Sequence, residues 1–181
     1  MIREKWEKLI LPVVAVLILV ADQVSKYLVV TYMELGESWS PIPALERLFV
    51  FRYATNTGVA FGLFPNKGYL FMVIAMAVVV IIVLYYRHLP RGQWLIRISL
   101  GLQLGGALGN LLDRVRLGRV TDFIDFRIWP VFNLADMSIV AGVSILAFSL
   151  LREDWLERKQ HGTEGIEGKK GKKGSSLPLS D

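Results

Sequence analysis

Long apolar runs separated by polar connections dominate the first 151 residues of the chain. Four such runs lie at Leu9–Tyr32, Tyr69–Tyr86, Trp94–Leu112 and Leu134–Leu151. Each is close to the roughly 20 residues that cross a bilayer as a helix. The first run continues past Asp22 and three more runs follow it, so we expect an uncleaved span rather than a signal peptide. The pattern predicts a mainly α membrane protein with a four-transmembrane-helix bundle.

The connection over residues 33–68 has the composition of a small β-sheet. Glycine and proline interrupt it early, at Gly36, Pro41 and Pro43. Residues 47–54 are then rich in aromatic and β-branched side chains, which favour a strand, and Asn56-Thr57-Gly58 signals a turn. The apolar residues 58–64 are too few to span a bilayer. We expect an antiparallel β-sheet platform on the outer leaflet, with an ordinary amphipathic loop as the alternative. Asn56 either caps the turn or contacts a substrate backbone.

The connection over residues 113–133 contains a second predicted strand, in the segment RVTDFIDFRIWP. Its aspartates, Asp122 and Asp125, are three residues apart, so their side chains leave opposite faces of a strand. Only one of them can therefore look into a shared site, and the pattern does not say which. Asn133 and Asp136 open the last helix, where such residues are most often caps. A capping role and a role in a polar site both stay open for this pair.

Ionisable side chains inside apolar runs cost roughly 2.5–3.5 kcal/mol each at the bilayer centre, so they need an explanation. Asp22 and Lys26 are four residues apart and share a helix face. They form either an internal ion pair that lets each charge tolerate burial or a pair that supports a polar site near the outer side. In the third run a polar face is formed by Gly106, Asn110, Asp113 and Arg114. A second stripe of small residues, suited to close helix packing, is formed by Gly101, Gly105 and Gly109.

Composition and charge set the class and the orientation. Hydrophobic residues make up 53% of the 181 residues, and there is no cysteine. A disulfide framework, a thiolate metal site and a cysteine nucleophile are therefore excluded. The two histidines, His88 and His161, lie in an expected loop and in the tail, away from the membrane. Basic residues cluster before the first run, between the second and third runs and after the fourth, which places both termini in the cytoplasm and residues 33–68 and 113–133 outside.

The gathering of carboxylates at the outer side admits several interpretations. Four aspartates and two asparagines lie there: Asp113, Asp122, Asp125, Asp136, Asn110 and Asn133. Two of the aspartates suit an aspartyl-protease-type dyad, whereas more of them could hold Mg²⁺ or Ca²⁺ in a metal-dependent hydrolase. A small ion or solute transporter also places charges in the membrane, but the second and fourth runs have apolar middles. A non-enzymatic scaffold leaves the aspartates unexplained.

Five sequence blocks carry a resemblance to a known family. ADQVSK, NTGVAFG, GGALGNLLDR, VTDF and FNLADMSI occur in this order. With them the chain resembles the lipoprotein signal peptidase (signal peptidase II) family up to about residue 155. The resemblance implies an aspartyl endopeptidase of the bacterial cytoplasmic (inner) membrane. Such an enzyme cleaves the signal peptide from a prolipoprotein just before a cysteine that bears diacylglyceryl. Paired carboxylates that activate a water molecule require no metal or other cofactor. As partners we expect the prolipoprotein and membrane lipids, with no nucleic acid, and we expect a monomer.

The resemblance also implies roles for individual residues. It makes Asp122 and Asp136 the catalytic pair, at the outer face of the membrane. Residues that bind substrate or support the dyad are Asn56, Asn110, Arg114 and Asn133. Structural polar residues are Asp22, Lys26 and Asp113. Asp125 falls outside the matching blocks.

The last part of the chain loses the hydrophobic pattern. From Arg152 onward it becomes rich in glycine, lysine and serine, a composition typical of disorder. We therefore expect a four-span peptidase domain over residues 1–155 and a basic, disordered cytoplasmic tail over residues 156–181. The tail lysines either contact anionic lipid or are simply solvated.

Overall fold

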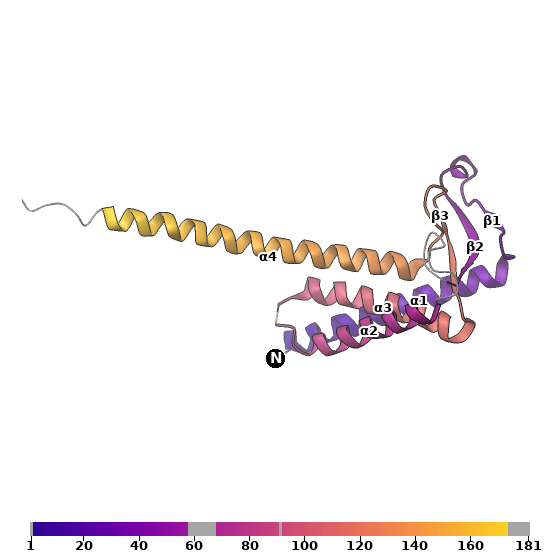
Figure 1. Ribbon diagram of the computed structural model, residues 1–181, viewed down its shortest axis with the longest axis horizontal. Helices are drawn as coiled ribbons and strands as arrows, with labels where there is room; N and C mark the ends of the chain where they lie inside the picture. The colour runs from indigo at the N-terminus through magenta and orange to yellow at the C-terminus, as the bar shows by residue number, and fades with distance from the viewer. Residues whose placement is uncertain (1, 58–67, 91, 174–181) are drawn as a thin grey trace, which may run out of the picture.

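The computed structural model describes residues 2–57, 68–90 and 92–173. In chain order the elements are α1 (Ile2–Tyr32), β1 (Ser38–Trp39), a 3₁₀ turn η1 (Pro43–Leu45), β2 (Val50–Asn56), α2 (Gly68–Tyr86), α3 (Trp94–Leu117), β3 (Val120–Asp125) and α4 (Leu134–Lys173). The fold is mainly α with one small sheet, as the hydropathy pattern predicted (Figure 1). The predicted apolar stretch 58–64 lies outside the described residues.

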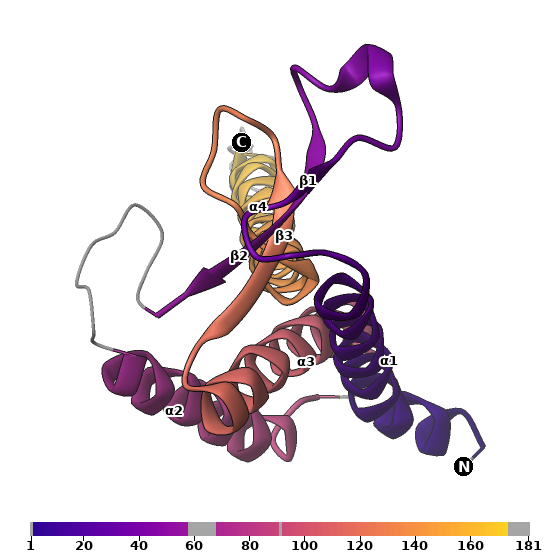
Figure 2. The ribbon, with the colours of Figure 1, turned by 90° about the vertical axis from the view of Figure 1, so that its right-hand side faces the viewer.

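The helix α3 is the centre of the bundle. It packs against α1, α2 and α4, and Figure 2 shows it between α1 and α2. The predicted glycine stripe faces α1: a Cβ on Gly105 would lie 2.6 Å from the carbonyl oxygen of Ala15. Gly109 leaves room for the carboxylate of Asp22, and Gly106 faces α4 at Ala135. The glycines therefore let α1 and α4 approach the backbone of α3.

The sheet is antiparallel, with strand order β1-β2-β3. In the register of β2 and β3, Ala54 pairs with Asp122 and Asn56 with Val120. The sheet stands at the end of the bundle where α4 begins (Figure 1). Both predicted strands exist, although β2 starts at Val50, three residues later than the aromatic pattern indicated, because the chain is still turning there. The main-chain N–H of Phe49 donates to the carbonyl of Leu45.

Helix lengths refine the predicted spans. Three helices are long and apolar enough to cross a bilayer, over Trp6–Tyr32, Trp94–Leu117 and Leu134–Leu156. The apolar part of α2 counted on the described residues, Met72–Tyr86, is shorter than these, so the number of four spans stays a prediction. The third helix passes the predicted end at Leu112 and stops at Leu117, before Gly118, which has φ +69°. Asp113 and Arg114 therefore lie on a helix and not in the outward connection.

The last helix also extends beyond its predicted end. It continues past Leu151 to Lys173, through most of the segment 156–181 for which the composition predicted disorder. Up to Lys173 the segment holds no proline, and its three glutamates, five lysines and Arg158 are good helix formers, while its four glycines are not. The division into a domain over 1–155 and a tail stays a prediction.

Candidate active site

Asp122 and Asp136 come together at the junction of β3 and α4, and Asn133 joins them. The side-chain amide of Asn133 donates to Asp122 Oδ1 at 2.7 Å, and its main-chain N–H donates to Asp136 Oδ2 at 3.3 Å. Asn133 is fully buried and Asp122 is 4% exposed. The sequence separates Asp122 from Asp136 by a loop, and this one asparagine brings their carboxyl groups to one place.

The first turn of α4 shows why Asn133 and Asp136 occupy these positions. Asn133 precedes the helix, and its Oδ1 accepts a hydrogen bond from the Asp136 N–H at 3.0 Å. Asp136 returns a bond by accepting the N–H of Asn133, which is the reciprocal arrangement of a capping box. The capping interpretation is therefore confirmed. Capping does not exclude a role in a site, because Asn133 Nδ2 donates to Asp122 and Asp136 Oδ1 accepts from Asn110, both outside the helix end.

Asn110 on α3 supports Asp136 from the other side. Its Nδ2 donates to Asp136 Oδ1 at 2.8 Å. Its Oδ1 accepts hydrogen bonds from Lys26 Nζ at 3.0 Å and from Asn133 Nδ2 at 3.1 Å. An ammonium group can only donate, so Lys26 fixes the orientation of this amide. With its oxygen committed to Lys26, Asn110 presents its nitrogen to Asp136.

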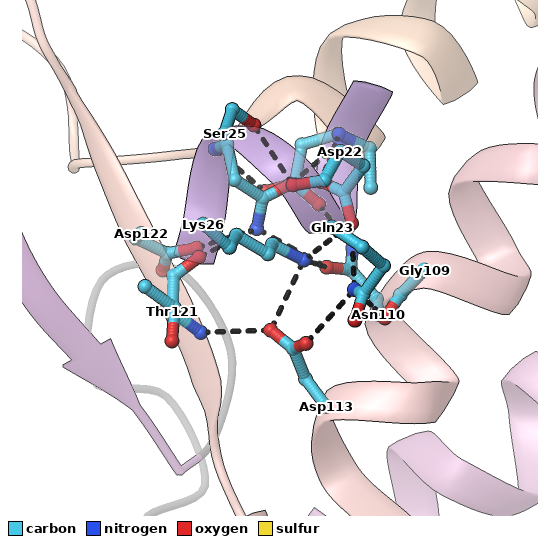
Figure 3. Close-up of polar contacts among 12 residues, drawn as sticks. Asp22, Gln23, Ser25, Lys26, Gly109, Asn110, Asp113, Thr121 and Asp122 are labelled. Atoms are coloured by element: carbon cyan, nitrogen blue, oxygen red, sulfur yellow. Dashed lines mark hydrogen bonds and ion pairs between the residues drawn. The ribbon is translucent and has the colours of Figure 1, made fainter. Parts of the chain in front are cut away.

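The predicted ion pair of α1 is present and is part of a larger group. Lys26 Nζ lies 2.8 Å from Asp22 and 3.1 Å from Asp113, with all three side chains at most 5% exposed. Figure 3 shows Lys26 reaching from α1 towards Asp113 and Asn110 on α3. A buried cation shared by two carboxylates is strongly held, because its removal would leave two buried carboxylates without a counter-ion.

Two further predicted residues border the pair less directly. The side chain of Asn56 hydrogen-bonds Asp122. Residues 58–62 of its sequence block lie outside the described residues. Arg114 is half-buried, donates to the carbonyl oxygen of Asn110 at 3.4 Å, and interacts electrostatically with Asp136 and Asp122.

Asp125 lies in a different environment, as strand alternation predicted. It accepts a hydrogen bond from the main-chain N–H of Arg127 at 2.7 Å. The guanidinium groups of Arg52 and Arg127 lie 3.9 and 4.0 Å from its carboxylate. Asp125 is thus satisfied by a local turn and by two arginines, and it does not join the pair of Asp122 and Asp136.

The electrostatics of Asp122 suit acid–base chemistry near neutral pH. Burial, followed by the charge of nearby Asp136, raises the pKa of Asp122 from 3.8 to about 7. Hydrogen bonds from Asn133 and Asn56 oppose this rise because they favour the ionised form. Two carboxyl groups in this relation hold one proton between them over a wide pH range and titrate as a unit.

Gln23 is a half-buried residue of the polar site that the sequence analysis did not predict. Its amide lies among the carboxylates, donating to Asp113 Oδ1 at 3.0 Å and to Asp22 Oδ2 at 3.2 Å. The signal available in the sequence was weak: a glutamine three residues before Lys26, and so on the same side of the helix.

An apolar cavity of about 530 Å³ lies beside the site, between the end of α1 and the sheet. It is lined by Leu28, Tyr32, Trp39, Phe51 and Phe123, among others. Because side chains alternate along a strand, Phe123 faces this cavity while its neighbour Asp122 faces the other way. The cavity is therefore separate from the carboxyl pair. Within the described part of the chain, no three acidic or histidine side chains converge as metal ligands would.

Comparison with known proteins gives one consistent result. The family described as signal peptidase (SPase) II matches residues 14–152. The lipoprotein signal peptidase of Moorella thermoacetica is 51% identical over 137 residues, covering 76% of this chain and 89% of that protein. That of Halothermothrix orenii is 44% identical over 142 residues, covering 78% and 95%. A solved structure described as a bacterial membrane enzyme is 32% identical, with a TM-score of 0.70 over 78% of this chain and 87% of the other.

Proposed function

The chain belongs to the signal peptidase II family of aspartic peptidases, and on that basis we propose that Asp122 and Asp136 are its catalytic pair. The observation that carries the assignment is their shared partner, Asn133, which donates to both carboxyl groups. Family membership and the long apolar helices make the chain a bacterial inner-membrane protein. The comparisons support the peptidase and give no support to the transporter that the buried charges also suggested.

From the contacts of the two aspartates we infer different roles for them. Asp136 accepts an N–H on each oxygen, an arrangement that suits a carboxylate and hence the general base. Asp122, with its pKa of about 7, carries the shared proton at neutral pH and acts as the general acid.

The reaction then proceeds without a covalent enzyme intermediate. A water molecule attacks the scissile carbonyl carbon and gives a proton to Asp136, while Asp122 gives its proton to the carbonyl oxygen. The resulting tetrahedral diol collapses: the C–N bond breaks, and the leaving nitrogen takes up the proton that Asp136 had received. The second hydroxyl proton of the diol returns to the pair, so the shared proton is restored.

The substrate we propose is a prolipoprotein that carries diacylglyceryl on the cysteine following the scissile bond. The support is the name shared by the relatives, lipoprotein signal peptidase. A lipid anchor on the cysteine keeps the scissile bond near the headgroup level. In support, β3 and the start of α4, which carry the two aspartates, lie together at one end of the bundle (Figure 1).

For the topology we propose four spans, with α2 as the short one, both termini in the cytoplasm and the aspartates at the outer face. The positive-inside rule supports this orientation, because basic residues dominate the N-terminus, the loop between α2 and α3, and the end of the chain. We also propose that residues 1–155 form the peptidase domain and act as a monomer. Residues 156–181 would then be a basic cytoplasmic segment.

A cleavage assay on a diacylated prolipoprotein tests the assignment. Asp122→Asn and Asp136→Asn should each reduce kcat by about 10²–10⁴-fold, the usual contribution of general acid–base catalysis. Asp125→Asn is the matched control, because it removes a buried aspartate of the same strand and should retain most activity. Full cleavage by either of the first two purified variants would refute the assignment.

A further inference from the structure

The main chain next to each member of the proposed catalytic pair is held by a buried carboxylate. Asp113 Oδ2 accepts the N–H of Thr121, the residue before Asp122, at 3.1 Å. Asp22 Oδ1 accepts the N–H of Ala135, the residue before Asp136, at 3.0 Å. The position of each catalytic aspartate is therefore tied to a carboxylate on a neighbouring helix.

Lys26 connects these two carboxylates. Its ammonium group lies between Asp22 Oδ2 at 2.8 Å and Asp113 Oδ2 at 3.1 Å. A continuous series of polar contacts consequently runs from Ala135 to Thr121, through Asp22, Lys26 and Asp113, and Figure 3 shows the part of it from Asp22 to Thr121. The separation of β3 from the start of α4 depends on how closely the two carboxylates are held together.

Lys26 alone leaves these carboxylates with one excess negative charge. Gln23 supplies neutral donors to both, from Nε2 to Asp113 Oδ1 at 3.0 Å and to Asp22 Oδ2 at 3.2 Å, and it also reaches the carbonyl oxygen of Gly109 at 3.3 Å. Like charges repel strongly at low dielectric. A shared donor between them reduces that repulsion and fixes the geometry.

We propose that Gln23 is a positioning residue of the active site: by joining Asp22 to Asp113 alongside Lys26, it sets the separation of Asp122 and Asp136. The inference rests on the proposed function, because it matters for activity only if those two aspartates are catalytic. Gln23 donates to neither Asp122 nor Asp136. It acts through Asp22 and Asp113, which hold the main chain at Ala135 and Thr121.

Loss of the Gln23 donors should loosen the pair without removing any charge. A small misplacement of catalytic groups can reduce the rate by up to about 100-fold. Two carboxyl groups that lie farther apart are less strongly coupled. The pKa for loss of the first proton from the pair therefore rises, and the pKa for loss of the second proton falls. The charged groups facing the pair are Asp22 and Lys26 on α1, and Asp113 and Arg114 on α3. Gln23→Met removes none of these charges, although it removes a neutral donor to Asp22 and Asp113.

The test compares Gln23→Met with Gln103→Met in the full-length protein purified in detergent. Gln103 is the matched control, since it is also a half-buried helical glutamine and donates from Nε2 to Ser99 Oγ at 3.1 Å, away from the aspartates. The substrate is a fluorogenic peptide with a diacylated cysteine. We expect Gln23→Met to lower kcat by about 10- to 100-fold with little change in KM. The acid limb of its pH–kcat profile should move to higher pH and the alkaline limb to lower pH. Gln103→Met should have the kcat and the pH–kcat profile of the native enzyme.

Two results would overturn the inference. One is a Gln23→Met variant with the kcat and pH profile of Gln103→Met; the other is an effect on KM alone, which would indicate substrate binding. Thermal unfolding of both variants measures any general loss of stability. Such a loss would not shift the limbs of the pH–kcat profile, whereas a change in the positions of the two catalytic aspartates would. If Asp122→Asn or Asp136→Asn were active, the proposed function itself would fail. If both were inactive and Gln23→Met behaved as its control, only the positioning role would fail.

Discussion

The side-chain amide of Asn133 lies 2.7 Å from Asp122 Oδ1, although Asn133 immediately precedes α4 and Asp122 belongs to β3. The same residue caps α4 and receives the backbone N–H of Asp136 on its own oxygen. Formation of the last helix and closure of the carboxyl pair are thus one structural event. Asn133 caps α4 through its side-chain oxygen and contacts Asp122 through its side-chain nitrogen. Substitutions that keep one of these bonds and remove the other can therefore measure each role.

Replacement of Asn133 by serine should leave the cap and remove the bridge. Serine is a good N-cap, whereas alanine is not and typically loses about 1 kcal/mol of stability. We expect Asn133→Ala to be less stable than Asn133→Ser by about that amount, and both to lose at least about 10-fold in kcat because Asp122 is no longer oriented. Thermal unfolding and cleavage rates measured on the same preparations check this. A serine variant with native kcat would show that the amide bridge is dispensable.

Cleavage should decline as the pH rises through about 7. Catalysis requires one proton on the pair, and Asp122, whose pKa is raised to about 7, loses it above that value. The pH–kcat profile should therefore have an alkaline limb near neutrality and an acid limb several units lower, where the pair takes up its second proton. Initial rates between pH 4 and 9 on a lipid-anchored peptide give the profile. An alkaline limb beyond pH 9 would contradict the assignment of the proton to Asp122.

The same pKa predicts how stability varies with pH. Because the pKa of Asp122 is raised on folding, from 3.8 to about 7, its favourable contribution is complete below about pH 3.8 and is lost as the pH rises to about 7. Asp122→Asn avoids a buried charge and should raise the melting temperature at pH 8. The expected gain is at least about 1 kcal/mol, or roughly 2–4 °C. At pH 4 the variant and the native protein should melt alike; an equal gain at both values would point to some other cause.

Close packing of α3 on α1 should make Gly105 intolerant of any side chain. A Cβ there would lie 2.6 Å from the Ala15 carbonyl oxygen and 2.8 Å from Ile18 Cβ, so the helices must separate. Overpacking of this kind costs about 1–3 kcal/mol, against a gain in helix propensity of up to about 1 kcal/mol for alanine over glycine. Gly105→Ala should therefore lower the unfolding temperature in detergent. An unchanged or higher temperature would show that the helix pair can shift freely.

Removal of divalent cations should not affect the enzyme. The expected chemistry uses two carboxyl groups and water, with no metal to polarise the substrate. The rate with a strong chelator should match the untreated rate within about twofold, and added Mg²⁺ or Ca²⁺ should not increase it. Loss of activity that returned on adding a cation would revive the metal-dependent hydrolase that the aspartates also suggested.

Periodicity and local chemistry determined the elements of this protein and several of their faces. Apolar runs located the four helices, aromatic and β-branched residues located β2 and β3, and the spacing of Asp22 and Lys26 predicted their ion pair. Strand alternation showed that Asp122 and Asp125 must diverge. These inferences succeed because each depends on side chains a few residues apart, whose relative direction the helix or strand geometry imposes.

Only the tertiary structure decided which polar groups meet. Spacing alone gave no reason to prefer Asp122 over Asp125, whereas in the fold Asn133 contacts Asp122 and Asp136, and Asp125 lies with Arg52 and Arg127. Little in the sequence indicated a role for Gln23, since its partner Asp113 is distant in sequence and the glycines of α3 allow α1 to lie close to it. Hydrogen bonds depend on distances of a fraction of an ångström, and no local pattern sets such distances between separate helices.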